Sequence, residues 1–125
     1  MRDLKSNLQA VTSLAPAAIT ASANGSGVDL RGFDAAMVTF VVGTVTDGTH
    51  TPSLEESDND SSYTPVAAAD LIGAFVALTS GANQSVGYRG GKRYVRAVTT
   101  VAGATTGGVY AAIVLRGRPA HAPVA

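Results

Sequence analysis

TPSLEESDNDSSYTPVAAADL, residues 51–71, has the pattern of a β-hairpin tip. A short strand over residues 53–56 runs into a polar, acidic turn over residues 57–62, and a second short strand over residues 63–66 leaves it. Pro, Asn, Asp and Ser clusters favour turns and strand ends, whereas Val, Thr and Tyr favour strands. The stretch therefore predicts two short paired strands within a β-rich protein.

The same alternation of strand-forming and turn-forming residues continues along most of the chain. The strongest strand signal is AAMVTFVV, residues 35–42, whose two faces are both largely apolar, as in a strand at the centre of a sandwich. Two long strands, residues 92–101 and 109–115, are expected to pair with each other as a hairpin. Further short strands are expected at residues 27–31, 72–78 and 84–88, with a hairpin-type turn at residues 46–48.

About seven to nine short strands at intervals of about 8–12 residues are typical of an all-β protein. We predict an antiparallel β-sandwich or jelly-roll-like barrel over residues 26–116. An N-terminal arm, residues 1–25, and an extended C-terminal tail, residues 117–125, flank this domain. Pro16 and the turn-forming sequence ASANGSG, residues 21–27, favour extended structure in the arm, which either packs on the sheet or reaches a neighbour.

Charge is sparse and divided along the chain. The 125 residues carry nine Lys or Arg and nine Asp or Glu, and 14% of residues are charged, against roughly 25% in ordinary soluble domains. A surface so poor in charge suits a protein that hides part of its surface in an assembly, and it is also compatible with a monomer rich in small residues. Between residues 47 and 70 all charged residues are acidic, namely Asp47, Glu55, Glu56, Asp58, Asp60 and Asp70, and after Asp70 all are basic.

Eight charged residues from these two segments are the candidates for contacts between subunits. They are Glu55, Glu56, Asp58 and Asp60 of the acidic turn, and Arg89, Lys92, Arg93 and Arg96 of the basic segment. Opposite charges on two edges attract one another within one fold or join one copy to the next. The sequence leaves both arrangements open.

No constellation of catalytic residues is evident, and we do not expect an enzyme. His50 and His121 have no partner at metal-ligand spacing and are expected to be ordinary exposed loop histidines. The acidic turn lacks the Gly and the closing Glu of an EF-hand, and the chain has no Cys. We therefore expect no metal and no cofactor. Equal numbers of acids and cations argue against specific nucleic-acid binding, and no apolar run approaches a membrane span.

The hairpin LEESDNDSSYTPV, residues 54–66, resembles the "strand, S-D-D-G-S, aromatic, T-x-V" hairpin common in jelly-roll modules of phage structural proteins and in galactose-binding-like sandwiches. Asn59-Asp60 stands where that hairpin usually has Asp-Gly. Together with the flanking segments VDLRGFDAAMVTFVVGTVTDG and GYRGGKRYVRAVTTVAGATTGGVYAAIVLRGRPAHAPVA, the chain is similar to small virion proteins of tailed bacteriophages. The resemblance covers residues 28–124, and such proteins tend to be encoded among head and connector genes.

This resemblance implies a structural role. The first expectation is a capsid decoration (cement) protein that binds the outside of the major capsid shell and bridges neighbouring subunits. Its partners are then the major capsid protein and copies of itself, with a trimer as the form considered. It is expected on the virion surface after synthesis in the host bacterial cytoplasm, with no membrane and no specific nucleic acid as partners.

Two alternatives keep the same fold. One is a head–tail connector or tail protein of a tailed phage, and the other is a carbohydrate-binding module. A carbohydrate binder needs exposed aromatic side chains on loops, for which Tyr63 and Tyr88 are the candidates.

Overall fold

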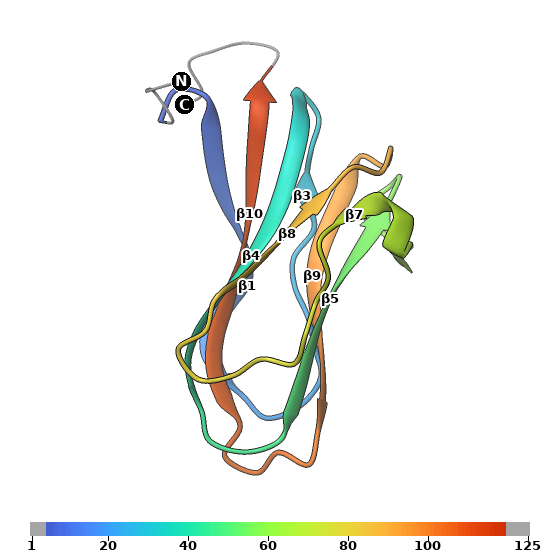
Figure 1. Ribbon diagram of the computed structural model, residues 1–125. Coiled ribbons are helices and arrows are strands. Elements are labelled where there is room, and N and C mark those ends of the chain that lie inside the picture. Colours follow the sequence, from blue (N-terminus) through green and yellow to red (C-terminus); the bar gives the residue numbers. More distant parts are fainter. Residues whose placement is uncertain (1–4, 120–125) are drawn as a thin grey trace.

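The computed structural model describes residues 5–119, which form two facing antiparallel β-sheets (Figure 1). The elements are β1 (Leu8–Ile19), β2 (Ala23–Asn24), β3 (Val28–Asp29), β4 (Phe33–Val45), β5 (Thr49–Ser57), β6 (Thr64–Pro65), a 3-10 turn η1 (Ala68–Asp70), β7 (Leu71–Ile72), β8 (Gln84–Tyr88), β9 (Tyr94–Ala102) and β10 (Gly108–Pro119). Within the described range, no helix is long and apolar enough to cross a membrane.

The strand order is that of a jelly roll. Sheet A has the order β1-β10-β4-β8-β7, and sheet B has the order β2-β9-β5-β6, with β3 also paired to β9. The first strand therefore lies beside the last, and the short second and third strands lie beside the one before it. This interleaving of early and late strands is the double Greek key of a jelly roll. The predicted all-β antiparallel sandwich is confirmed, and its topology is now specified.

Strand β4 shows why the two sheets pack together. Val38, Phe40 and Val42 are buried between the sheets, whereas Met37 and Val41 on the opposite face are 36% and 42% exposed. Because successive side chains of a strand alternate between faces, the inward apolar face of β4 packs against sheet B while its other face points outward. The core that forms around Phe40 includes Leu14, Val28, Leu54, Val86, Val95, Ala97, Tyr110, Ala112 and Val114.

The expected hairpin between the two long C-terminal strands is wrong. Strand β9 pairs with β5 in sheet B, whereas β10 pairs with β1 and β4 in sheet A. The connection between β9 and β10 crosses from one sheet to the other at the lower end of Figure 1, and so does the connection between β4 and β5. The inward faces of β9 and β10 are both apolar, and they bury each other across the core instead of lying side by side.

Most of the expected N-terminal arm belongs to the sandwich. Residues 8–19 form β1, which pairs with β10 from Leu8, opposite Gly117, to Ile19, opposite Gly108. Two register shifts near Pro16 allow this edge strand to include a proline, which has no N–H to donate. The expected C-terminal tail is also shorter than predicted, because β10 runs to Pro119. The remaining tail residues, 120–125, lie outside the described residues.

Ser13 joins the former arm to the opposite sheet. Its hydroxyl donates to the Ser26 carbonyl at 2.8 Å and accepts from the Ala97 backbone N–H at 2.9 Å, and its side chain is buried. A buried hydroxyl with both partners satisfied stabilises this junction, whereas an unpaired one costs free energy. The N-terminal strand is thus part of the domain and not an appendage.

The expected strand over residues 72–78 is present only as Leu71–Ile72. Gly73 has a positive φ of 103°, and the chain then leaves the sheet until β8. This excursion still contributes to the core, because Phe75 packs edge-on against Phe40 with ring centroids 6.0 Å apart. Of this apolar run, only Leu78 is fully buried and Phe75 is half-buried, whereas Ile72 and Val76 are exposed. The hairpin of residues 53–56 and 63–66 is confirmed, since β5 pairs with β6.

His50 is fully buried on the inward face of β5, so its predicted exposure is wrong. Its Nε2 lies 3.0 Å from the Asp47 carbonyl oxygen and its Nδ1 lies 2.9 Å from the Tyr110 hydroxyl. Because a carbonyl only accepts, Nε2 donates to Asp47, while Nδ1 pairs with the Tyr110 hydroxyl. The Tyr110 hydroxyl also lies 3.2 Å from Thr99 Oγ1. His121 lies outside the described residues.

Asp47 ties together the two connections that cross between the sheets. Its carboxylate accepts backbone N–H groups of Thr105, Thr106 and Gly107, the last at 2.7 Å. These hydrogen bonds lower the pKa of Asp47, and the one from the Gly107 N–H contributes most to the shift. The carboxylate therefore holds the connection between β4 and β5 against the connection between β9 and β10. This junction lies at the opposite end of the sandwich from the charged residues of the acidic turn.

Candidate interaction surface

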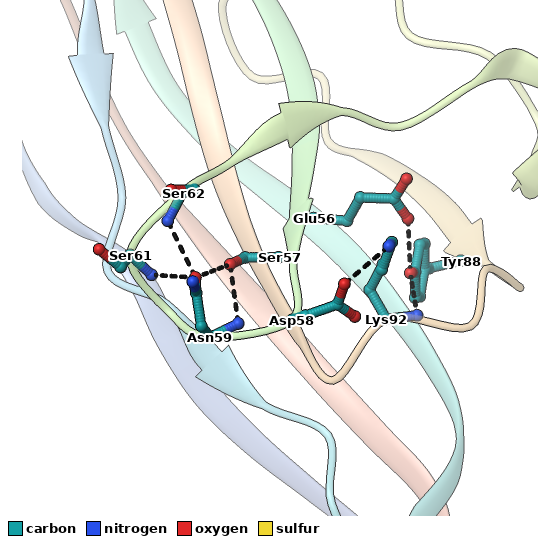
Figure 2. Close-up of polar contacts among 8 residues, drawn as sticks. All are labelled: Glu56, Ser57, Asp58, Asn59, Ser61, Ser62, Tyr88 and Lys92. Carbon is teal, nitrogen blue, oxygen red and sulfur yellow. Dashed lines mark hydrogen bonds and ion pairs between the residues drawn. The ribbon is translucent and has the colours of Figure 1, made fainter.

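Three of the candidate residues, Glu56, Asp58 and Lys92, lie where the acidic turn faces the connection between β8 and β9 (Figure 2). Strands β5 and β9 are neighbours in sheet B, and their register places Glu55 opposite Arg96 and Ser57 opposite Tyr94. The acidic and basic segments, far apart in the sequence, therefore meet within one subunit. Any further contact that these residues make with another subunit remains a prediction.

Glu55 and Arg96 form the most protected ion pair of this surface. The Arg96 Nη2 lies 2.6 Å from the Glu55 Oε1, its Nε lies 2.8 Å from the same oxygen, and the two side chains are only 23% and 20% exposed. The guanidinium also stacks over the ring of Tyr63, 4.2 Å from its centroid. Partial burial and stacking strengthen a charge pair beyond what an exposed pair contributes.

We expect Glu55→Lys to lower the free energy of unfolding by about 1–2 kcal/mol, because it removes a partly buried partner and sets two cations against each other. Urea denaturation of the purified protein measures this. Asp58→Lys serves as the control, since Asp58 is 71% exposed in its pair with Lys92, and its midpoint should not change. Unchanged stability of Glu55→Lys together with weaker self-association would instead place the contribution of Glu55 between subunits.

Tyr88 links the acidic turn to the basic loop. Its hydroxyl donates to the Glu56 Oε1 at 2.8 Å and accepts the backbone N–H of Lys92 at 3.1 Å, while the Lys92 Nζ lies 2.8 Å from the Asp58 Oδ2 (Figure 2). Burial, followed by the bond to Glu56, raises the pKa of Tyr88, and the bond to Asp58 raises the pKa of Lys92. Tyr88 is only 6% exposed, so this buried side chain connects the acidic turn to the loop between β8 and β9.

The acidic turn is closed by Asn59. Its side-chain oxygen accepts the Ser57 hydroxyl and the backbone N–H groups of Ser61 and Ser62, each at 3.0 Å (Figure 2). The next residue, Asp60, has a positive φ of 58° and accepts the Tyr63 hydroxyl. Asp tolerates the left-handed region better than most residues, which explains how this hairpin replaces the usual glycine. Among residues 5–119, no group of three His, Asp or Glu is placed to hold a metal ion.

Arg93 and Arg89 do not contact the acidic turn. Arg93 makes a two-pronged pair with Asp29 of β3, with Nη2 2.7 Å from Oδ2 and Nε 2.9 Å from Oδ1. This pair lowers the pKa of Asp29 to about 2. The Arg89 Nε donates to the Ala69 carbonyl at 3.3 Å. The contribution of Asp29 was not evident in the sequence, because only the pairing of β3 with β9 brings it beside Arg93.

A groove of about 700 Å³ opens beside these loops. Its charged lining consists of four cations and two acids, Arg31, Arg89, Lys92, Arg93, Asp34 and Asp58, around the apolar residues Leu30, Phe33 and Ile72. Since Lys92 pairs with Asp58 and Arg93 with Asp29, much of the positive charge is already compensated inside the subunit. The groove is therefore lined by a mixture of charged and apolar side chains.

Acid is expected to destabilise the fold between about pH 4 and 2. The folded-state pKa of Asp29 is about 2 and that of Asp47 is also below its ordinary value of 3.8, so the unfolded chain takes up protons first as the pH falls. Their contributions are complete above about pH 4 and decline as the pH falls toward these lowered values. Urea midpoints measured from pH 7 to pH 2 check this. Asp29→Asn should reduce the slope, and an unchanged slope would contradict the role of the Arg93 pair.

Comparison with known proteins identifies the fold. No family model and no curated protein matches the sequence. Among solved structures, the chain is similar to the SPBc2 prophage-derived protein YomS, with a TM-score of 0.58 and 16% identity over 89% of this chain and 94% of that one. A more distant similarity, with a TM-score of 0.46 and 10% identity, covers 93% of this chain and 34% of a chain of infectious bursal disease virus Gx strain. The chain thus shares its fold, nearly end to end, with YomS.

Proposed function

We propose that this protein is a structural component of a tailed-phage virion, and specifically a capsid decoration protein that binds the outer surface of the shell and bridges neighbouring subunits. The observation that carries the proposal is the end-to-end similarity in fold to a prophage-derived protein. The jelly-roll topology adds support, because this sandwich recurs in viral capsid domains. The sparse charge of the chain also favours a surface that is partly covered in an assembly.

The paired charges suit repeated docking on a regular shell. Glu55, Asp58 and Asp29 each have a cationic partner within the subunit, so the surface offers polar groups without a large uncompensated charge. Each contact with the shell is then weak, and bridging of two subunits by one molecule supplies the gain in affinity.

Glycan binding is less well supported. Tyr88 is buried, and the ring of Tyr63 is covered on one face by the Arg96 guanidinium. Neither side chain stands free as the flat platform on which a sugar ring stacks, so the two aromatic candidates of the carbohydrate-binding alternative are already engaged inside the subunit.

Quantitative mass spectrometry of purified particles of the encoding phage, with co-sedimentation of the protein on empty expanded capsids, tests the proposal. A decoration protein should be present on the order of hundreds of copies per particle and should sediment with the capsids, because shells repeat one site many times. About a dozen copies would indicate a connector ring, and multiples of six along a tube would indicate a tail protein. Absence from the particle and from the capsid pellet would overturn a virion role.

A further inference from the structure

The outer face of sheet A carries no charged side chain over the middle of its strands, within the described residues. Its positions alternate with the buried ones and are Ala10 and Thr12 of β1, Ala35, Met37, Thr39, Val41 and Gly43 of β4, Ile72 of β7, Ser85 and Gly87 of β8, and Val109, Ala111, Ile113 and Leu115 of β10. Three cross-strand pairs form its centre: Met37 with Leu115, Thr39 with Ile113, and Val41 with Ala111.

Large apolar side chains on this face are open to solvent. Val109 and Ile72 are 48% and 58% exposed, in addition to Met37 and Val41. Two hydroxyl groups near the centre of the face pair with each other, since Thr39 Oγ1 lies 3.0 Å from Ser85 Oγ. A contiguous apolar surface of this kind usually marks an interaction site.

The outer face of sheet B is different. Strand β5 presents Thr49, Thr51, Ser53 and Glu55 there, and β9 presents Tyr94, Arg96, Val98, Thr100 and Ala102, so this face includes the ion pair of Glu55 and Arg96. Because the two sheets come from one chain with the same overall composition, the contrast is a property of the faces. The outer face of sheet B carries charged and polar side chains that suit contact with water, whereas the uncharged outer face of sheet A suits burial against a partner.

We propose that the outer face of sheet A binds the same face of a second copy, around a two-fold axis. In such an interface each residue near the axis meets its own counterpart, so any charge there would meet a like charge. A face free of charge over the described strands is what two identical sheets can bury together. A partner of different sequence would place no such restriction on it.

The size of the face fits this contact. Strands β1, β10 and β4 have 12, 12 and 13 residues and β8 has 5, and together they span roughly 600–700 Å² in the plane of the sheet. Because side chains project from the sheet, the accessible area of the face exceeds this planar area and approaches the roughly 800 Å² per partner of a standard interface. A notch of about 240 Å³ at one end of the face, lined by Leu8, Ala35, Ala36, Met37, Leu115 and Gly117, gives it relief that a protruding side chain of the partner can enter.

Multi-angle light scattering of the full chain tests the proposal and does not depend on any role in a virion. We expect a mass of twice the chain, and we expect Val41→Lys to raise the dissociation constant at least about tenfold and to shift the mass toward the monomer. Thr51→Lys, at an exposed position of sheet B, is the matched control and should stay dimeric. Thermal melts establish that both variants are folded.

Single-cysteine cross-linking supplies a second readout, because the chain has no cysteine of its own. With a short bis-maleimide, Val41→Cys should form a cross-linked dimer and Thr51→Cys should not. A monomer at about 100 µM, a concentration that would reveal even a weak dimer, would overturn the proposal. So would a trimer, or a dimer that persists in Val41→Lys.

Discussion

Replacement of His50 by alanine is expected to lower the free energy of unfolding by about 2–4 kcal/mol, the largest effect of any single side chain at a polar position of this core. The imidazole is fully buried and packs edge-on against Tyr110, with ring centroids 5.3 Å apart. Truncation leaves a cavity, removes one of the two hydrogen-bond partners of the Tyr110 hydroxyl and removes the imidazole partner of the Asp47 carbonyl. Chemical denaturation monitored by circular dichroism measures the loss.

Two further variants show whether the hydrogen bond contributes beyond the packing. Thr51→Ala, at the next and exposed position of the same strand, should change stability by less than about 0.5 kcal/mol. Tyr110→Phe keeps the ring and removes the hydroxyl, and should cost about 1–3 kcal/mol. A double-mutant cycle that combines His50→Ala with Tyr110→Phe should show strong coupling between the two residues. A His50→Ala variant as stable as Thr51→Ala would contradict the buried network.

The second large effect is expected at Gly107, in the connection between β9 and β10. Gly107 has a φ of +82°, and a Cβ placed there would lie 2.1 Å from the Ile19 carbonyl oxygen. Gly107→Ala therefore combines an unfavourable backbone conformation with a clash against backbone that cannot move independently of β1. We expect a loss of about 2–4 kcal/mol, measured as a shift of the urea midpoint.

Gly103 offers a matched control in the same connection. It also has a positive φ, +70°, but a Cβ there would have nothing within 4 Å. Gly103→Ala should therefore cost only the conformational part, about 1–2 kcal/mol. Equal losses at the two positions would mean that the close approach of Ile19 contributes nothing.

The fold class was predictable because most strands carry a local sequence signal, although β1 was predicted as an arm and the strand expected over residues 72–78 is mostly a loop. The alternation in β4 and the Ser, Asn and Asp cluster after β5 depend only on neighbouring residues. The sheet to which a strand belongs is not local, since a turn such as residues 46–48 looks the same whether the chain reverses within a sheet or crosses to the other one. Both long-strand connections were mispredicted for this reason.

The charge pairs and the buried histidine illustrate two kinds of missed information. Glu55 and Arg96 are 41 positions apart in the sequence, and their pairing follows from the register between β5 and β9, which composition does not encode. His50 did leave a signal, because THTPSLE alternates outward Thr and Ser with inward His, Pro and Leu. That two-residue period extends β5 back to Thr49 and places the imidazole with the core, although a histidine near a Gly and a Pro suggested a loop.

The pairing of β1 with β10 has a consequence for how the protein is made. The first strand of sheet A lacks its neighbour until the last strand has left the ribosome, because Leu8 pairs with Gly117. The nascent chain therefore cannot close sheet A before β10 has emerged, and its folding depends on contacts between distant parts of the sequence, which form slowly. During this interval the exposed apolar strands can associate with other chains, so the yield of folded protein on expression should depend on chaperones and temperature more than the stability of the finished sandwich suggests.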